Sequence, residues 1–317
     1  SMTIKKFDHE KAYYLFKKIR STEEKIIEIY KSDVIKSPVH LSLGQESIAV
    51  GIALATDKKK DIVFSNYRSH AHFIAHGGNY KKMWAELFGK ETGLSSGKAG
   101  SMHLGDLDIN FIFTSAIVGS AISEAVGYSL AIKLKKLNSR VICYHGEGAI
   151  DQGTFWESLN FSALKELPIL FVCENNQLAI YSEQKKRMKS LDVCKKVRSF
   201  GVYAIKIKDN STENIFKYAQ KALQRIKKNS KPVFLEIDTY REVDHVGINN
   251  DFKLGYRKRN KQKQFKSLNE LNFLKKRTKN FSQIQKKIIK EINQALHYSY
   301  KSNFPKIKHI DSNVTKK

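Results

Sequence analysis

Residues 140–176 read RVICYHGEGAIDQGTFWESLNFSALKELPILFVCENN. Two apolar runs in this stretch, residues 140–144 and 169–173, are short and rich in the branched and aromatic residues typical of buried strands. Residues 155–164, between them, have the periodicity of a helix. Strand, helix and strand in this order predict a right-handed βαβ unit whose two strands run parallel.

The rest of the chain extends this alternation of strands and helices. Further segments are predicted as strands at 62–65, 204–207 and 232–238, and as helices at 122–130, 215–226 and 284–296. The last helix follows a polar, lysine-rich connection over residues 249–278. We therefore expect an α/β fold, with a mostly parallel sheet, helices on both of its faces, and helical N- and C-terminal extensions.

No internal repeat or linker divides the 317 residues, so we predict a single domain over residues 2–317. It begins with a helical part at about 8–60 and continues with a core at about 61–245. A basic helical extension at about 250–317 completes the predicted domain.

Composition excludes several classes of protein. Hydrophobic residues make up 41% of the chain, enough to bury a sizeable core, and the apolar runs are far shorter than the roughly 20 residues of a membrane helix. The N-terminus shows no apolar signal segment, and the three cysteines lack the spacing of a metal site. We expect a cytoplasmic protein that does not bind a membrane.

The formal net charge is +26, and residues 251–317 hold 19 basic and 4 acidic residues of the total. A solvated lysine-rich surface is our preferred interpretation, and an acidic protein partner is the alternative. Nucleic-acid binding is not expected, because the chain carries no zinc-finger, helix-turn-helix or RNA-recognition signature.

Polar groups follow both strands of the central βαβ unit. Glu147 lies between Gly146 and Gly148 after the first strand, and Asn176 follows the second, 29 positions further on. The carboxyl ends of neighbouring parallel strands meet at one crevice, where ligands bind. A carboxylate and an amide oxygen there suit Mg²⁺, and the two glycines let the backbone approach a diphosphate that also meets the N-terminus of the next helix.

The stretch from Gly146 to Asn176 resembles the thiamine diphosphate binding motif, and the whole chain resembles one family. That family is the α subunit of the first, decarboxylating component of 2-oxo acid dehydrogenase complexes, such as pyruvate, branched-chain and acetoin dehydrogenases. The further stretches that carry the resemblance are Leu43-Gly44-Gln45-Glu46, Tyr67-Arg68-Ser69-His70, Gly97-Lys98-Ala99-Gly100-Ser101-Met102-His103, Ile117-Val118-Gly119, Tyr240-Arg241 and His245.

The resemblance implies roles for these residues in a thiamine diphosphate-binding domain. Glu147, Asn176 and the backbone carbonyl of Leu178 match magnesium ligands. His245 and His103 are the implied catalytic groups. The implied cofactor-binding residues surround the diphosphate, the thiazolium and the aminopyrimidine ring, and they are Tyr67, Arg68, Ile117, Val118, Gly119, Gly146, Gly148, Ala149 and Arg241.

The sequence departs from the family pattern in four places. Glu147 replaces the usual Asp, and Asp151 stands where an Asn is usual. An extra acid beside a diphosphate is unfavourable unless Asp151 points away or caps the following helix. Val243-Asp244-His245 replaces a His-Gly-His run, and Thr114-Ser115-Ala116 replaces Gly-Asn-Gly.

The family places the carboxylate that activates the aminopyrimidine on a β subunit. We therefore expect this chain to be inactive alone and to form an assembly of two α and two β subunits. Glu46 is predicted to be a structural acid in the first turn of a helix. A small-molecule 2-oxo acid is the implied substrate, and a lipoyl acyltransferase is an implied further partner. Two alternatives stay open: a split transketolase-like or carboligating enzyme of sugar or surface-glycan metabolism, and a non-catalytic degenerate subunit.

Overall fold

The structure is a computed structural model that describes residues 5–257 and 267–309. Within these residues the main sheet has six parallel strands in the order β2-β1-β3-β4-β8-β7. Their bounds are β1 (Ile62–Asn66), β2 (Phe111–Ser115), β3 (Val141–Gly146), β4 (Ile169–Asn175), β7 (Tyr203–Ile207) and β8 (Val233–Asp238). The predicted α/β fold with a mostly parallel sheet is therefore confirmed.

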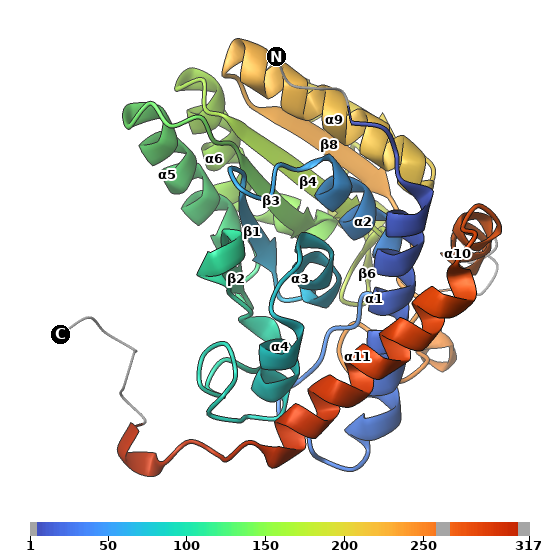
Figure 1. The fold of residues 1–317 in the computed structure, drawn as a ribbon. Coiled ribbons are helices and arrows are strands. Elements are labelled where there is room, and N and C mark those ends of the chain that lie inside the picture. The colour runs from blue at the N-terminus through green and yellow to red at the C-terminus, as the bar shows by residue number, and fades with distance from the viewer. Residues whose placement is uncertain (1–4, 258–266, 310–317) are drawn as a thin grey trace.

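Helices cover both faces of the sheet, as predicted (Figure 1). One face is covered by α5 (Ser120–Leu134), α6 (Gly153–Leu164) and α8 (Val193–Ser199). The other face is covered by α1 (His9–Tyr30), α2 (Glu46–Ala55), α3 (His70–His76) and α9 (Thr212–Asn229). Figure 1 shows α5 and α6 on one side of the sheet, and α2 and α9 on the other.

Alternation along the central strands produces these two cores. In β3, Ile142 and Tyr144 point into the core beside α1, α2 and α9, whereas Val141 and Cys143 point into the core beside α5 and α6. Successive strand side chains point to opposite faces, so a strand covered on both sides is apolar throughout. That requirement explains why the continuous apolar runs predicted the central strands well.

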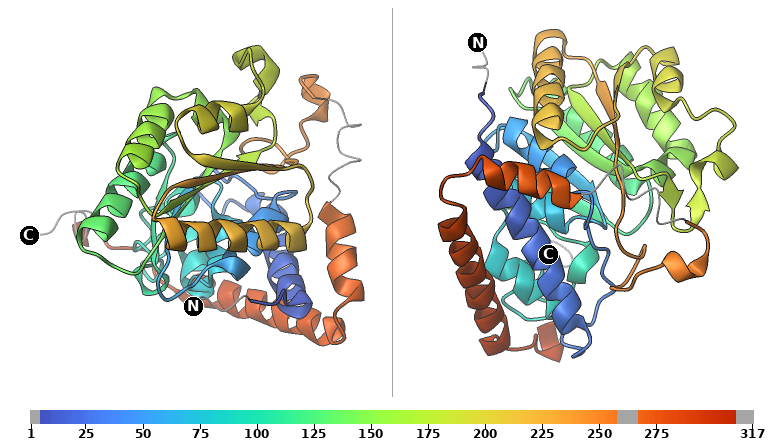
Figure 2. Two further views of the ribbon diagram at one scale, coloured as in Figure 1. Left: turned by 90° about the horizontal axis from the view of Figure 1, so that it is seen from above. Right: turned by 90° about the vertical axis from the view of Figure 1, so that its right-hand side faces the viewer.

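The C-terminal helices pack against the N-terminal one. The remaining helices and strands are α4 (Tyr80–Leu87), α7 (Gln184–Arg187), α10 (Ser267–Lys276), α11 (Phe281–Lys301), and the antiparallel pair β5 (Leu178–Ala179) and β6 (Ser182–Glu183). Figure 2 shows α11 lying along α1. The buried residues of α11, among them Ile284, Ile288 and Ile292, belong to the same core as those of α1 and the sheet.

Several elements were not predicted, among them α3, α7, α8, the β5–β6 pair, β2 and α10. Strand β2 is a short edge strand of five residues that pairs only with β1 among the described strands. Helix α10 lies in what we predicted to be a polar connection, and it buries Leu271 and Leu274. The apolar residues Leu268 and Phe273 of this short helix are not fully buried, so its sequence shows little amphipathic pattern. Part of that connection, residues 258–266, lies outside the described residues.

In the part of the chain that the structure describes, no helix combines the length and the apolar character needed to cross a bilayer. The three cysteines, Cys143, Cys173 and Cys194, are all buried and free.

Candidate functional site

A pocket of about 260 Å³ opens at the carboxyl edge of the sheet. It collects side chains that follow β1, β2, β3, β4 and β8, as expected for a ligand site in an open parallel sheet. It brings together all but one of the site residues predicted from the sequence: Tyr67, Arg68, Ile117, Val118, Gly119, Gly146, Glu147, Gly148, Ala149, Asn176, Leu178, Arg241 and His245.

The exception is His103, which is not among the described residues that line the pocket. Its Nδ1 lies 3.2 Å from the backbone carbonyl of Thr114, so the ring is held by the end of β2. Its catalytic role stays a prediction that the geometry of this chain does not support. Glu46 is also outside the lining, where its fully buried carboxylate accepts bonds from Arg20 Nε at 2.8 Å and from the backbone N–H of Gly44 at 2.9 Å.

The carboxylate side of the pocket is built on the turn after β3. The side chain of Glu147 is completely buried, and its Oε1 lies 2.5 Å from Arg187 Nη2. Its Oε2 has no hydrogen-bond partner among the described residues. Burial raises the pKa of Glu147, and the ion pair with Arg187 only partly opposes that shift. A buried carboxylate oxygen without a partner is costly, so a ligand or cation there would be stabilising.

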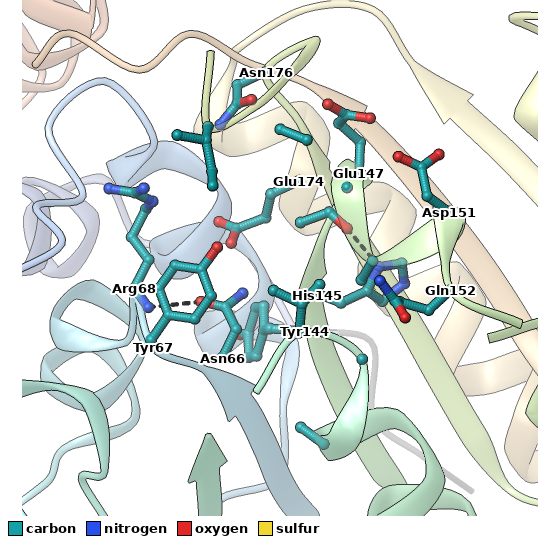
Figure 3. A pocket seen from close by; sticks show the side chains of 18 of the residues that line it. Asn66, Tyr67, Arg68, Tyr144, His145, Glu147, Asp151, Gln152, Glu174 and Asn176 are labelled. Carbon is teal, nitrogen blue, oxygen red and sulfur yellow. Dashed lines mark hydrogen bonds between the residues drawn. The ribbon is translucent and has the colours of Figure 1, made fainter. Parts of the chain in front are cut away.

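Asp151 lies on the solvent-exposed side of the turn, and its side chain does not cap the following helix. Asp151 forms a second ion pair with the same arginine, because Arg187 Nη1 donates to Asp151 Oδ2. Figure 3 shows Glu147 and Asp151 on the same side of the pocket, opposite Tyr67 and Arg68. The extra acid is therefore compensated within the chain.

Asn176 follows β4, the strand beside β3, so it lies at the same sheet edge as the turn that carries Glu147. Its Nδ2 donates to Gln45 Oε1 at 2.9 Å, and its Oδ1 accepts from the backbone N–H of Leu178 at 3.1 Å. Glu147, Asn176 and the Leu178 carbonyl offer three oxygen donors of the kind that a hard divalent cation prefers. No cluster of three His, Cys, Asp or Glu residues occurs in the described chain, so any metal here depends on this mixed donor set.

The two glycines of the turn act differently. A Cβ on Gly148 would lie 2.9 Å from the Cβ of Ala179, so glycine is needed there for β5 to approach the turn. A Cβ on Gly146 would meet no described atom within 4 Å, which leaves open space beside the backbone. The predicted close approach of a ligand to this turn is therefore possible at Gly146, which lines the pocket.

The arginine side of the pocket consists of Arg68 and Arg241, which are both buried. Arg68 Nη1 donates to the Leu41 carbonyl at 2.7 Å and Nη2 to the His245 carbonyl at 3.0 Å. Burial and the charge of Arg241 lower the pKa of Arg68 to about 10. The guanidinium stays charged at neutral pH, and it is held by groups that carry no net charge.

Arg241 is held by a larger network. Its Nε donates to the Val243 carbonyl at 2.9 Å, and its Nη2 donates to the Tyr256 hydroxyl at 2.8 Å and lies 3.3 Å from Asp251 Oδ2. Arg257 shares Asp251, so that one carboxylate serves two guanidinium groups. The arginine side therefore carries excess positive charge, which an anion such as a diphosphate would neutralise.

His245 stands beside both arginines. Its Nδ1 lies 3.5 Å from Arg68 Nη2 and 3.4 Å from Arg241 Nη1. Burial and the two guanidinium charges lower the pKa of His245 to about 3, so the ring is neutral at pH 7. Because Nδ1 faces two donors, we assign the proton to Nε2. His245 is thus a neutral hydrogen-bond donor in this form of the protein.

The remaining predicted residues border the open side of the pocket. Ile117 and Val118 follow β2 and are 71% and 42% exposed. Gly119 has φ +88°, and a Cβ there would lie 3.2 Å from Thr154 Cγ2. This left-handed conformation at the start of α5 favours glycine. Tyr67 packs its ring 5.7 Å from that of His245.

Several lining residues had no predicted role. Glu174 is the second-last residue of β4, and its Oε1 lies 3.1 Å from His72 Nε2. His72 Nδ1 in turn lies 2.8 Å from Ser65 Oγ, and its ring stacks on Tyr144 with centroids 3.9 Å apart. The polar residues at the end of the second predicted strand pointed to Glu174 as a possible site residue. Nothing in the sequence indicated its contact with His72, which lies 102 positions away. Gln45, Asn66, Ser115, His145 and Ile180 also line the pocket without having been predicted.

Comparison with known proteins gives a consistent result over nearly the whole chain. The family described as "Dehydrogenase E1 component" matches residues 15–309. The α subunit of acetoin:2,6-dichlorophenolindophenol oxidoreductase from Bacillus subtilis is 32% identical over 310 residues, 94% of this chain and 91% of its own.

Two pyruvate dehydrogenase E1 component α subunits show similar agreement. The protein from Rickettsia felis is 33% identical over 88% of this chain and 84% of its own length. The protein from Rhizobium meliloti is 33% identical over 77% of this chain and 70% of its own. By this match over most of its length, the chain belongs to the dehydrogenase E1 component family, as an α subunit.

Proposed function

We propose that this chain is the α subunit of a thiamine diphosphate-dependent 2-oxo acid dehydrogenase, and that the pocket at the sheet edge binds the cofactor. The observation that carries the proposal is the opposition of two sides of one pocket. Arg68 and Arg241 supply excess positive charge, and Glu147, Asn176 and Leu178 supply oxygen donors. An anion bound together with a divalent cation, here Mg²⁺, matches both sides.

Different residues of the chain would contact the diphosphate, the metal and the reacting groups. Arg68 and Arg241 would hold diphosphate oxygens, and the N-terminus of α6 would add a partial positive charge. Glu147, Asn176 and the Leu178 carbonyl would hold the metal. When bound, thiamine diphosphate supplies the nucleophilic carbon and the electron sink for decarboxylation. His245 Nε2–H would donate a hydrogen bond toward the reacting groups, and neutralisation of the two arginines by the diphosphate would make the ring more basic.

A β subunit is the proposed partner, in an assembly of two α and two β subunits. Support comes from a set of exposed apolar residues on and around α5 and α6: Ile117, Val118, Tyr128, Leu134, Leu137, Phe161 and Leu164. Scattered exposed apolar residues are normal, but this many on adjacent elements beside a pocket indicates an interaction surface. In α5, a Cβ on Gly127 would meet no described atom within 4 Å, so that small residue is open to a neighbour.

We further propose a small-molecule 2-oxo acid as substrate, a lipoyl acyltransferase as a downstream partner, and a cytoplasmic location. The free, buried cysteines fit a reducing compartment. The relatives do not favour the alternatives of a transketolase-like enzyme or a non-catalytic subunit.

The test is calorimetric titration of the full chain with thiamine diphosphate, in Mg²⁺ and in a chelator, followed by assays with a β subunit. We expect binding that requires the metal, and decarboxylation of pyruvate or a related 2-oxo acid rather than turnover of sugar phosphates. No binding of thiamine diphosphate, with or without the β subunit, would reject the proposal.

A further inference from the structure

Arg187 is a positive charge placed on the predicted metal ligand. It is the last residue of the short helix α7, and its side chain is only 16% exposed. Nη2 lies 2.5 Å from Glu147 Oε1, Nη1 pairs with Asp151, and Nε donates to the Ser182 carbonyl at 3.3 Å. The guanidinium therefore bridges two carboxylates and ties β6 and α7 to the turn that carries Glu147.

This contact gives Glu147 a counter-ion from within the chain. A buried carboxylate without a nearby cation is strongly unfavourable, so the metal-free pocket gains stability from Arg187. A divalent cation bound to Glu147 would bring two further positive charges next to the same guanidinium, and like charges at such distances repel. The same ion pair thus stabilises the metal-free protein and opposes the metal.

Asp151 gives the arginine a second binding partner. Because Asp151 lies on the outer, solvent-exposed side of the turn, Arg187 can keep this ion pair when Glu147 binds a cation. Glu147 also keeps a second oxygen, Oε2, that has no partner among the described residues. The geometry therefore allows the guanidinium to shift toward Asp151 without leaving the turn.

We propose that Arg187 is the counter-ion of the metal-free site: it neutralises Glu147 until a divalent cation binds, competes with that cation for the carboxylate, and retreats onto Asp151 when the cation is bound. This inference rests on the proposed function, because it assumes that Glu147 is a metal ligand. It also gives a reason for the acid at position 151, since Asp151 holds the displaced arginine.

Manganese binding tests the inference without an activity assay. Mn²⁺ is titrated into the full chain with saturating thiamine diphosphate, and free Mn²⁺ is read by electron paramagnetic resonance. For Arg187→Gln we expect about tenfold tighter Mn²⁺ binding, a change of about 1.4 kcal/mol. Arg187→Lys, which keeps the charge but cannot bridge two carboxylates, should lie between wild type and Arg187→Gln.

Lys185→Gln is the matched control. Lys185 is in the same helix, its side chain is 65% exposed, and its ion pair is with Glu183 rather than Glu147. The substitution removes the same unit of charge nearby, so a general electrostatic effect would tighten binding in both variants. We expect less than a twofold change for Lys185→Gln.

A second measurement is the melting temperature of the metal-free chain. Arg187→Gln should melt a few degrees below wild type without metal, and Mn²⁺ with thiamine diphosphate should raise its melting temperature more than that of wild type.

The outcomes separate this inference from the proposed function. If wild type binds Mn²⁺ and Arg187→Gln binds it equally or more weakly, the counter-ion inference is rejected and the proposed function stands. If neither protein binds Mn²⁺ in the presence of thiamine diphosphate, both are rejected, because removal of the competitor should have exposed the site.

Discussion

The arginine side of the pocket and its carboxylate side are held by different kinds of contact. Arg68 is held by the Leu41 and His245 carbonyls, which fix the guanidinium without cancelling its charge. Glu147 is held by Arg187, a full opposite charge. The arginine side is therefore ready for an anion, whereas the carboxylate side already has a counter-ion.

This difference shows how one chain can stabilise a positively and a negatively charged side within the same pocket. Like charges on Arg68 and Arg241 are tolerable because both guanidinium groups donate to neutral backbone carbonyls, and because Arg241 also pairs with Asp251. Among the described residues, the carboxylates of Glu147 and Asp151 have no comparable set of backbone donors, and Arg187 supplies the opposite charge instead. The four predictions below test each side and the boundary between them, beginning with the largest expected effect.

The first prediction concerns the activating carboxylate, which the family places on the β subunit. The purified chain should not decarboxylate 2-oxo acids even with thiamine diphosphate and Mg²⁺ saturating, and a β subunit should restore activity. A missing acid–base group costs about 10²- to 10⁴-fold in rate. Initial rates with and without the β subunit measure the effect. Glu46 is the acid to mutate if the chain proves active alone, although its carboxylate is buried against Arg20.

The second prediction breaks the carboxylate side. Glu147→Ala and Asn176→Ala should each weaken metal-dependent thiamine diphosphate binding by about a hundredfold, since loss of even an outer-shell partner costs about 10- to 100-fold. Calorimetry at several Mg²⁺ concentrations measures the change. Glu157→Ala and Asn160→Ala, both exposed positions of α6, are the matched controls. If both pocket variants bind thiamine diphosphate with wild-type affinity, Glu147 and Asn176 are not metal ligands.

The third prediction concerns substitutions on the arginine side of the pocket. Arg68→Ala and Arg241→Ala should each cost about 1.5–3 kcal/mol of cofactor binding, the loss of a charge-assisted hydrogen bond. That is roughly tenfold to over a hundredfold in affinity. Arg241→Ala should also lower the melting temperature of the cofactor-free chain, because Asp251 loses one of its two arginines.

The control for the arginine variants is Arg225→Ala, which removes an exposed guanidinium that stacks on Tyr203 at 4.1 Å, away from the pocket. Unchanged cofactor affinity in both pocket variants would show that the diphosphate binds elsewhere. A loss in one variant only would show which guanidinium contacts it.

The sequence predicted the βαβ unit and the pocket residues because both depend on local patterns. Apolar runs identify strands that are buried on both faces, and polar residues at strand ends must meet at one sheet edge. Arg187 was not predicted, because it ends a basic run, Lys185-Lys186-Arg187, and its carboxylate partner is 40 positions away. Strand β2 and helix α10 were missed for a related reason: each is short and depends on packing partners that the local sequence does not show.

The charge state of His245 could not be predicted from the sequence either. Its neutral form follows from burial and from two arginines, one of them 177 positions away in the chain, that converge only in the fold. The resemblance implies a catalytic role for His245 but does not give its charge, whereas burial beside Arg68 and Arg241 lowers the pKa of the ring and keeps it neutral.

The fourth prediction tests that neutral state through stability. Burial and neighbouring arginines lower the pKa of His245 to about 3, whereas in the unfolded chain it is about 6.5. Between these values the unfolded chain binds a proton that the folded chain does not, so stability falls as pH decreases from about 6.5 toward 3. His245→Gln removes this difference, so its melting temperature should drop by a few degrees less than that of wild type between pH 7 and pH 5. His297→Gln, at an exposed position of α11, is the control and should follow wild type. If His245→Gln and wild type lose stability in parallel, the folded chain takes up this proton as readily as the unfolded chain does, and the two arginines do not hold the imidazole neutral.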